Sequence, residues 1–127
     1  MCPVYINRIA SIHAESRNEK PYFSAQEPDY KEMITNANLR RRMSRMIKMG
    51  VACGLECLKD ISPEKVDAII TATGLGCLTD TEKFMNALMD NREQMLNPTA
   101  FIQSTFNTIG AQIALLLKIH AYNVTYV

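Results

Sequence analysis

The chain has 127 residues, of which 47% are hydrophobic and 21% charged, and its formal net charge is +1. This length allows one domain with a modest core, and this composition excludes intrinsic disorder. A net charge so close to zero also gives no overall field that would favour nucleic acid. We therefore predict a single domain over residues 1–127.

The first third of the chain predicts one strand and one long loop. Residues 4–13 form a β-prone run whose apolar positions change phase in the middle, which predicts a strand with a bulge. Residues 14–33 are polar, contain two prolines and show no period, so we expect a loop of about twenty residues. The start of the chain has neither the basic region nor the apolar run of a signal peptide.

The first helix is predicted at residues 39–58, where apolar side chains recur every three or four residues. These side chains are Met43, Met46, Ile47, Val51, Leu55 and Leu58. Asn36 or Asn38 is placed to cap the start of this helix. Gly50 and Gly54 lie four residues apart, so we expect another backbone to approach that side of the helix closely.

A strand is predicted at residues 66–72, because a short, nearly continuous apolar run is typical of a parallel strand covered on both faces. The sequence TGLG then turns the chain, with Gly74 and Gly76 free to adopt positive φ. A dinucleotide-binding turn needs a third glycine, but this chain has Thr79 at that position. We therefore favour a plain strand-to-helix turn and expect no cofactor.

Two further helices and a strand complete the chain. Thr79 and Glu82 have the spacing of a capping box, which predicts a helix at residues 81–91 with Phe84 and Leu88 facing inward. A helix at residues 107–120 is so poor in charge that its own fold or a partner subunit must cover it. Residues 122–127 form a β-prone segment. This order predicts an α/β fold with parallel strands joined by right-handed crossovers.

The four cysteines are interpreted as buried structural thiols, since free cysteine packs like a small hydrophobic residue. They are Cys2, Cys53, Cys57 and Cys77. Neither histidine has the spacing of a further metal ligand, so we expect no metal site. No cysteine or histidine forms a catalytic set with its neighbours. The longest apolar run is far shorter than the roughly 18 residues that span a bilayer, so a cytoplasmic protein without a membrane partner is expected.

A basic cluster marks the first helix: Arg40, Arg41, Arg42, Arg45 and Lys48. Three interpretations remain open. The cluster is a solvated face, a nucleic-acid surface or a docking surface for an acidic protein, since a local basic patch steers such association. The low net charge and the absence of aromatic residues between the arginines count against nucleic acid.

Three motifs together resemble the N-terminal part of a β-ketoacyl synthase, a condensing enzyme of fatty-acid and polyketide assembly with a thiolase-like fold. They are RRRMSRMIKMGVACGLECLKD, VDAIITATGLGCLTDTEKF and PTAFIQSTFNTIGAQIALLLKIHAYNVTYV. The resemblance extends from about Asn38 to Val127 and implies a partial thiolase-like α/β fold with a mostly parallel sheet. In these synthases a nucleophilic cysteine follows the last of these strands, so it implies no catalytic residue within this chain.

The resemblance also implies partners and sites. The start of the first helix is where many members dock the acidic acyl carrier protein, which corresponds to Arg40, Arg41 and Arg45. The segment before the last strand lines the dimer interface and the acyl pocket, and here it contains Phe101, Ile102, Thr105, Phe106 and Asn107. A homodimer, or a heterodimer with a ketosynthase subunit, is the expected assembly.

The expected function is that of an N-terminal fragment of a β-ketoacyl-[acyl carrier protein] synthase-like protein of fatty-acid or polyketide biosynthesis, inactive by itself. The run TFNTIGAQ departs from the family pattern and suggests a branch near polyene-type pathways. One alternative is a non-catalytic partner subunit of the chain-length-factor type. Another is a small regulatory or nucleic-acid-binding α/β module.

Overall fold

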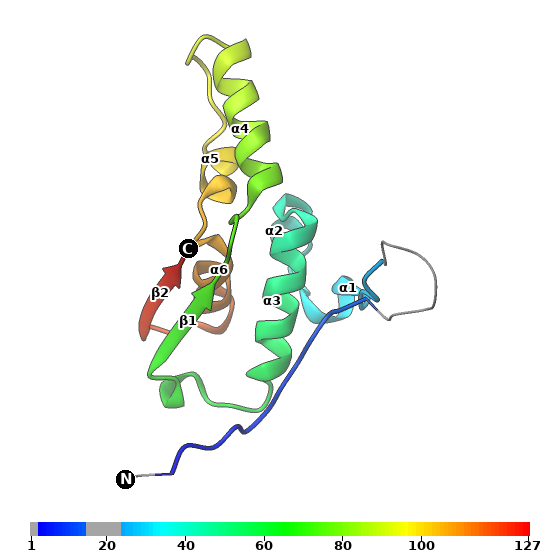
Figure 1. Cartoon of the computed structure of the whole chain (residues 1–127), viewed down its shortest axis with the longest axis vertical. Helices are drawn as coiled ribbons and strands as arrows, with labels where there is room; N and C mark the ends of the chain where they lie inside the picture. The colour runs from blue at the N-terminus through cyan, green and yellow to red at the C-terminus, as the bar shows by residue number, and fades with distance from the viewer. Residues whose placement is uncertain (1–2, 15–23) are drawn as a thin grey trace.

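The computed structural model describes residues 3–14 and 24–127. Its elements in chain order are α1 (Tyr30–Met33), α2 (Ala37–Arg42), α3 (Arg45–Cys57), the 3-10 turn η1 (Pro63–Lys65), β1 (Ala68–Ala72), α4 (Leu78–Asp90), α5 (Pro98–Ser104), α6 (Thr108–Leu117) and β2 (Tyr122–Tyr126). Figure 1 shows α4 and α5 projecting beyond the end at which both strands finish. The mixed helices and parallel strands match the predicted partial thiolase-like fold.

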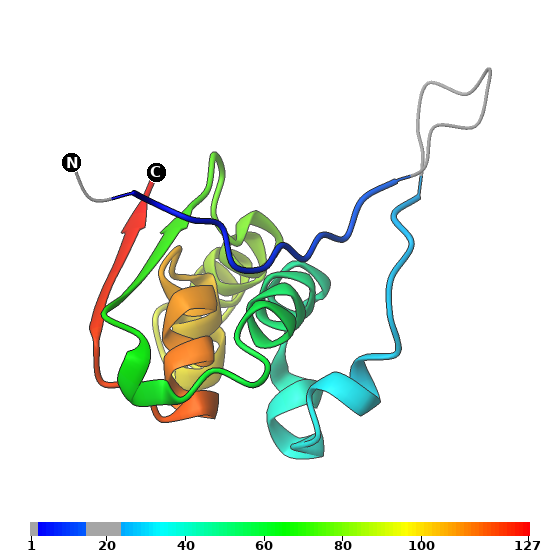
Figure 2. The same cartoon turned by 90° about the horizontal axis from the view of Figure 1, so that it is seen from below.

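The sheet consists of β1 and β2, which pair in parallel from Ala68 opposite Tyr122 to Ala72 opposite Tyr126. The predicted parallel pairing is therefore confirmed. The expectation that both faces are covered is wrong for the described residues, because α3 and α6 lie together on one side of the strands (Figure 2). On that side Ile69 is 8% exposed, whereas Ile70 on the opposite side is 66% exposed.

The core lies where α3, α6 and β1 meet, around Ile47, Val51 and Ile113. The two glycines of α3 make this contact possible. A Cβ atom added at Gly50 would lie 2.8 Å from Ile109 Cγ2, and one added at Gly54 would come even closer to Ile113 Cδ1. The close approach predicted for this side of the helix is thus confirmed, and the approaching helix is α6.

The first predicted helix is two helices, so its single span over residues 39–58 is wrong. Met43 and Ser44 have extended backbone, with ψ of 133° and 172°, and they separate α2 from α3. The break turns the Met43 side chain into the core, where it is 3% exposed, while Met46 points outward at 55% exposure. Asn36 caps α2 as expected, since its side chain accepts hydrogen bonds from the backbone N–H groups of residues 38 and 39.

The strand predicted at residues 4–13 is absent from the described part of the chain. This segment is extended, but it forms no ladder with another described strand. The Gln26 backbone N–H donates to the His13 carbonyl oxygen at 3.1 Å, next to a bridge between Ala14 and Ala25. A strand requires a neighbouring strand for its hydrogen bonds. Here the segment lies along α3, where Arg8 instead donates hydrogen bonds to the carbonyl groups of Glu56 (3.3 Å) and Lys59 (2.8 Å).

Of the predicted loop at residues 14–33, residues 15–23 lie outside the described residues. The last four residues form α1 rather than loop, which corrects the prediction. Asp29 explains this short helix, because its side chain accepts a hydrogen bond from the Lys31 backbone N–H at 2.8 Å. A side-chain acceptor before the first turn replaces a hydrogen bond that the helix itself cannot supply.

The helix predicted at residues 81–91 starts earlier, at Leu78, and the capping box of Thr79 and Glu82 is wrong. The N-cap residue is Cys77, which makes no side-chain capping bond. The turn before it depends on Gly76, whose φ is +60°, whereas no positive φ is needed at Gly74. The chain bends sharply there, so the helix begins as soon as the turn ends.

The region before the last predicted helix contains a separate helix, α5, that the sequence did not indicate. Asn97 caps it by accepting a hydrogen bond from the Thr99 backbone N–H, and Pro98 occupies its first turn. The axis then bends by 108° into α6. In the described part of the chain no single helix is long and apolar enough to cross a membrane, and α5 and α6 meet that criterion only as this bent pair.

Candidate functional site

The basic cluster lies at the junction of α2 and α3. Its first three arginines form the last turn of α2, where cations are stabilised by the carbonyl end of the helix. Arg45 begins α3 after the Met43–Ser44 break. The break therefore divides the predicted docking residues between two helices.

Arg40 is partly buried and has a structural role. Its guanidinium group donates a hydrogen bond to the carbonyl oxygen of Ile34, a residue that is only 1% exposed. Arg41 is exposed and donates to the Asn38 side chain at 2.8 Å. That bond lies within α2 and leaves the Arg41 side chain at the surface.

Arg45 is held by Glu27, a residue that sequence analysis did not single out. Its Nε atom donates to Glu27 Oε1 at 2.5 Å, while the Tyr30 hydroxyl donates to Glu27 Oε2 at 2.6 Å. The hydrogen bond from Tyr30, followed by the one from Arg45, lowers the pKa of the Glu27 carboxyl. Burial and the neighbouring Glu27 carboxylate raise the pKa of the Tyr30 hydroxyl. Both groups therefore keep their ordinary charge states at neutral pH, with Glu27 ionised.

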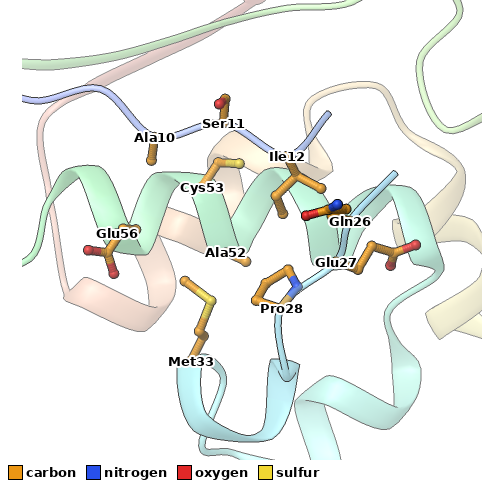
Figure 3. A pocket seen from close by; sticks show the side chains of 10 residues that line it. All are labelled: Ala10, Ser11, Ile12, Gln26, Glu27, Pro28, Met33, Ala52, Cys53 and Glu56. Atoms are coloured by element: carbon orange, nitrogen blue, oxygen red, sulfur yellow. The ribbon is translucent and has the colours of Figure 1, made fainter. Parts of the chain in front are cut away.

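A cavity of about 470 Å³ lies beside this pair, between the N-terminal segment, residues 26–28 and α3. Figure 3 shows Cys53 and Ala52 on α3, with Ile12 of the N-terminal segment above the helix and Pro28 below it in this view. The Glu27 side chain at its edge points along α3 and away from Cys53 (Figure 3). The cavity is thus mostly apolar, and the charged groups lie at its rim.

The second candidate segment is the bend between α5 and α6. Thr105 Oγ1 donates to the carbonyl oxygen of Ile102 at 2.9 Å and lies 3.0 Å from Thr108 Oγ1. The Thr108 hydroxyl donates to the same carbonyl and is 2% exposed. These two hydroxyl groups supply hydrogen bonds to a carbonyl oxygen at the end of α5, and they fix the angle between α5 and α6.

The bend presents apolar side chains to solvent. Phe101, Ile102 and Phe106 are 56%, 52% and 53% exposed. Phe101 also packs against Phe84 of α4, with ring centroids 5.5 Å apart. A Cβ atom added at Gly76 would lie 3.1 Å from Phe106 Cβ, so Phe106 sits against the turn that follows β1.

This segment therefore lies at the carboxyl end of the sheet. The two strands end together there, since the Thr73 backbone N–H donates to the carbonyl oxygen of Tyr126 at 2.9 Å. In α/β proteins, ligands bind outside the carboxyl ends of the strands. Asn107 is exposed and precedes α6 without forming a side-chain capping bond. Four of the five predicted residues in this segment thus surround one bend, and the fifth, Asn107, is the N-cap residue of α6.

Comparison with known families decides the relationship. The family described as beta-ketoacyl synthase, N-terminal domain, matches residues 13–125. The chain belongs to this family. The resemblance proposed from the three sequence motifs is therefore confirmed.

Among solved structures, the chain is similar to one described as the ketosynthase ApeO in complex with its chain length factor ApeC, from Xenorhabdus doucetiae. The TM-score is 0.62 and the sequence identity is 23% over 81% of this chain. The match spans only 40% of the length of that solved chain. At this identity the likeness supports the fold alone. No curated protein matches the chain.

The cysteines of this β-ketoacyl synthase domain are not exposed at the bend. Cys77 is 2% exposed, and burial raises its pKa above the ordinary value, as burial also does for the half-buried Cys53. Cys57 is half-buried too, and Cys2 lies outside the described residues. The structural interpretation is thus confirmed for Cys77. Within residues 3–14 and 24–127, no group of three or more His, Cys, Asp or Glu side chains is placed to hold a metal ion.

Sequence analysis did not find the Glu27–Tyr30–Arg45 cluster of this β-ketoacyl synthase domain. Glu27 precedes α1, whereas Arg45 begins α3, and the two residues are 18 positions apart. No helical or strand periodicity links such positions. The only available signal was a carboxylate in a polar segment near a cluster of arginines.

Proposed function

We propose that this chain is the N-terminal part of one β-ketoacyl synthase-like domain that takes part in a decarboxylative Claisen condensation. The observation that carries the proposal is the exposed apolar bend at Phe101–Asn107, which lies beside the turn after β1 at the carboxyl end of a parallel sheet. The family match over residues 13–125 supports it. The same proposal places the protein in the cytoplasm.

In this reaction an acyl group passes from a carrier-protein thioester to a cysteine thiolate and releases the carrier thiol. A malonyl thioester then loses CO₂, and its enolate carbon attacks the acyl thioester carbonyl, which frees the cysteine again. We assign no catalytic residue in this chain, and we propose that the chain alone does not catalyse condensation. Its role is to form one wall of the acyl pocket and one face of the dimer.

We propose that the acyl carrier protein binds at the α2–α3 junction, where Arg40, Arg41 and Arg45 contact it. Arg41 is exposed and Arg45 is 66% exposed at its side chain, so both are reachable by an acidic partner. Local positive charge of this kind raises association rates with acidic proteins. Arg40 contributes mainly by fixing the position of α2.

A second subunit would cover the apolar bend, as either a homodimer or a heterodimer. The solved structure that resembles this chain contains a ketosynthase together with its chain length factor, which favours the heterodimer. The second candidate function follows from that observation. In it, the domain belongs to a non-catalytic partner that shapes the acyl pocket of a separate ketosynthase.

One experiment separates these candidates. The complete gene product that contains this chain is incubated with acyl and malonyl carrier proteins, alone and together with its co-expressed ketosynthase partner, and carrier-bound products are followed by intact-protein mass spectrometry. Condensation by the protein alone supports the enzyme. Condensation that appears only with the partner, and is faster than with the partner alone, supports the pocket-shaping subunit. Products unaffected by the protein in both mixtures would refute both.

A further inference from the structure

Glu27 occupies the basic cluster as an acidic partner would. Both of its carboxylate oxygens are engaged, one by the Arg45 guanidinium at 2.5 Å and the other by the Tyr30 hydroxyl at 2.6 Å. Lys48, one helical turn after Arg45, acts on the same carboxylate through space and helps to lower its pKa. Two donors from two helices thus bind one carboxylate, and Lys48 adds positive charge to its surroundings.

Another carboxylate can replace Glu27 in its ion pair with Arg45. The Arg45 side chain is 66% exposed and that of Glu27 is 23% exposed, so the pair lies at the surface. An ion pair at the surface contributes little to stability, because water competes for both charges. A carboxylate on another protein can therefore replace Glu27 without leaving a buried charge behind.

We propose that Glu27 is an intramolecular competitor at this surface, and that an acidic segment of a partner protein binds by displacing it from Arg45 and Tyr30. The proposal deepens the docking role and rests on it for the identity of the partner. The residues between Ala25 and α1 then cover part of the basic cluster, and the Glu27 side chain holds them there. The partner group recognised here is a carboxylate, held in the two-bond geometry that Glu27 now shows.

The energy of the displaced pair limits the effect. Loss of an exposed ion pair changes affinity by roughly 1.4- to 5-fold. We therefore expect Glu27→Gln to tighten binding of an acidic partner by about 1.4- to 5-fold. Glu32→Gln is the matched control, since it removes the same charge from an exposed position on α1 that has no ion-pair partner in the described part of the chain.

The test uses the 127-residue chain and two probes, an acyl carrier protein and an oligoglutamate peptide, in calorimetric titrations at low ionic strength. Support requires tighter binding by Glu27→Gln than by Glu32→Gln, and loss of that gain when Arg45→Gln is added. Equal affinities for wild type, Glu27→Gln and Glu32→Gln would overturn the proposal. So would a gain that persists without Arg45.

The two probes keep this proposal separate from the docking function. If the carrier protein binds no variant while oligoglutamate binds Glu27→Gln more tightly, the docking function fails and the competitor role stands. If the carrier protein binds wild type and Glu27→Gln equally, the competitor role fails and docking stands. Oligoglutamate that binds no variant, together with a carrier protein that binds none, would overturn both.

Discussion

The contact between α3 and α6 leads to a sharp prediction at Gly54. Replacing Gly54 by alanine gains about 1 kcal/mol of helix propensity, because glycine is a poor helix former. The new methyl group would overlap Ile113, which is only 5% exposed and has little room to move. Overpacking of this kind costs about 1–3 kcal/mol. Since the overlap is the closest met by any glycine in the described chain, we expect a net loss of about 1–2 kcal/mol.

Urea unfolding followed by circular dichroism measures this change in the free energy of unfolding. Ile113→Val removes the atom that a Cβ at Gly54 would meet first and alone costs about 0.5–1.5 kcal/mol. The double variant Gly54→Ala/Ile113→Val should be more stable than the sum of the single losses predicts, by about 0.5–2 kcal/mol.

Gly74→Ala is the control, because its Cβ would meet nothing within 4 Å. Its stability should stay within about 0.5 kcal/mol of the wild type or rise slightly. A Gly54→Ala protein as stable as wild type, or strictly additive losses in the double variant, would show that the two helices are not packed as described.

Four further predictions follow from other contacts. Asn36→Ala should destabilise the fold by about 1 kcal/mol through loss of the α2 cap, and urea unfolding that shows no change would contradict the cap. Phe106→Asp should weaken self-association or partner binding in sedimentation experiments, whereas an unchanged oligomer would exclude the α5–α6 bend from the interface. Cys77 should react with iodoacetamide far more slowly than Cys53, and equal rates in the native protein would contradict its burial. The raised pKa of the Cys77 thiol means that the folded protein holds this proton more tightly. The stability that it contributes is present below the ordinary cysteine pKa of about 8.5 and declines as the pH rises above it. Cys77→Ala should reduce this decline, and the raised pKa of Cys53 accounts for a part that stays.

Features encoded by short spacings were predictable from the sequence. The two glycines four residues apart predicted a close helix contact at Gly50 and Gly54, and Asn36 was one of the two predicted caps. The apolar runs located both strands, and the helices between them implied that the strands are parallel. Each of these features depends on residues within a few positions of one another.

Features that depend on distant partners were not predictable. The run at residues 4–13 has β propensity, but in the described chain it lies against a helix, which offers no ladder of hydrogen bonds. The break at Met43 and Ser44 interrupts a periodic helix pattern because the core takes up the Met43 side chain. The pairing of Glu27 with Arg45 joins elements 18 residues apart. Tertiary contacts decide all three.

Two tyrosines on the uncovered side of the sheet provide an intrinsic spectroscopic probe of its burial. The chain contains no tryptophan and five tyrosines, and two of them, Tyr122 and Tyr126, project from β2 at 66% and 62% exposure. Whatever packs over these strands must remove both phenol rings from water. Their ultraviolet absorbance and emission should then shift on assembly, so that a label-free titration reports when this side of the sheet becomes covered.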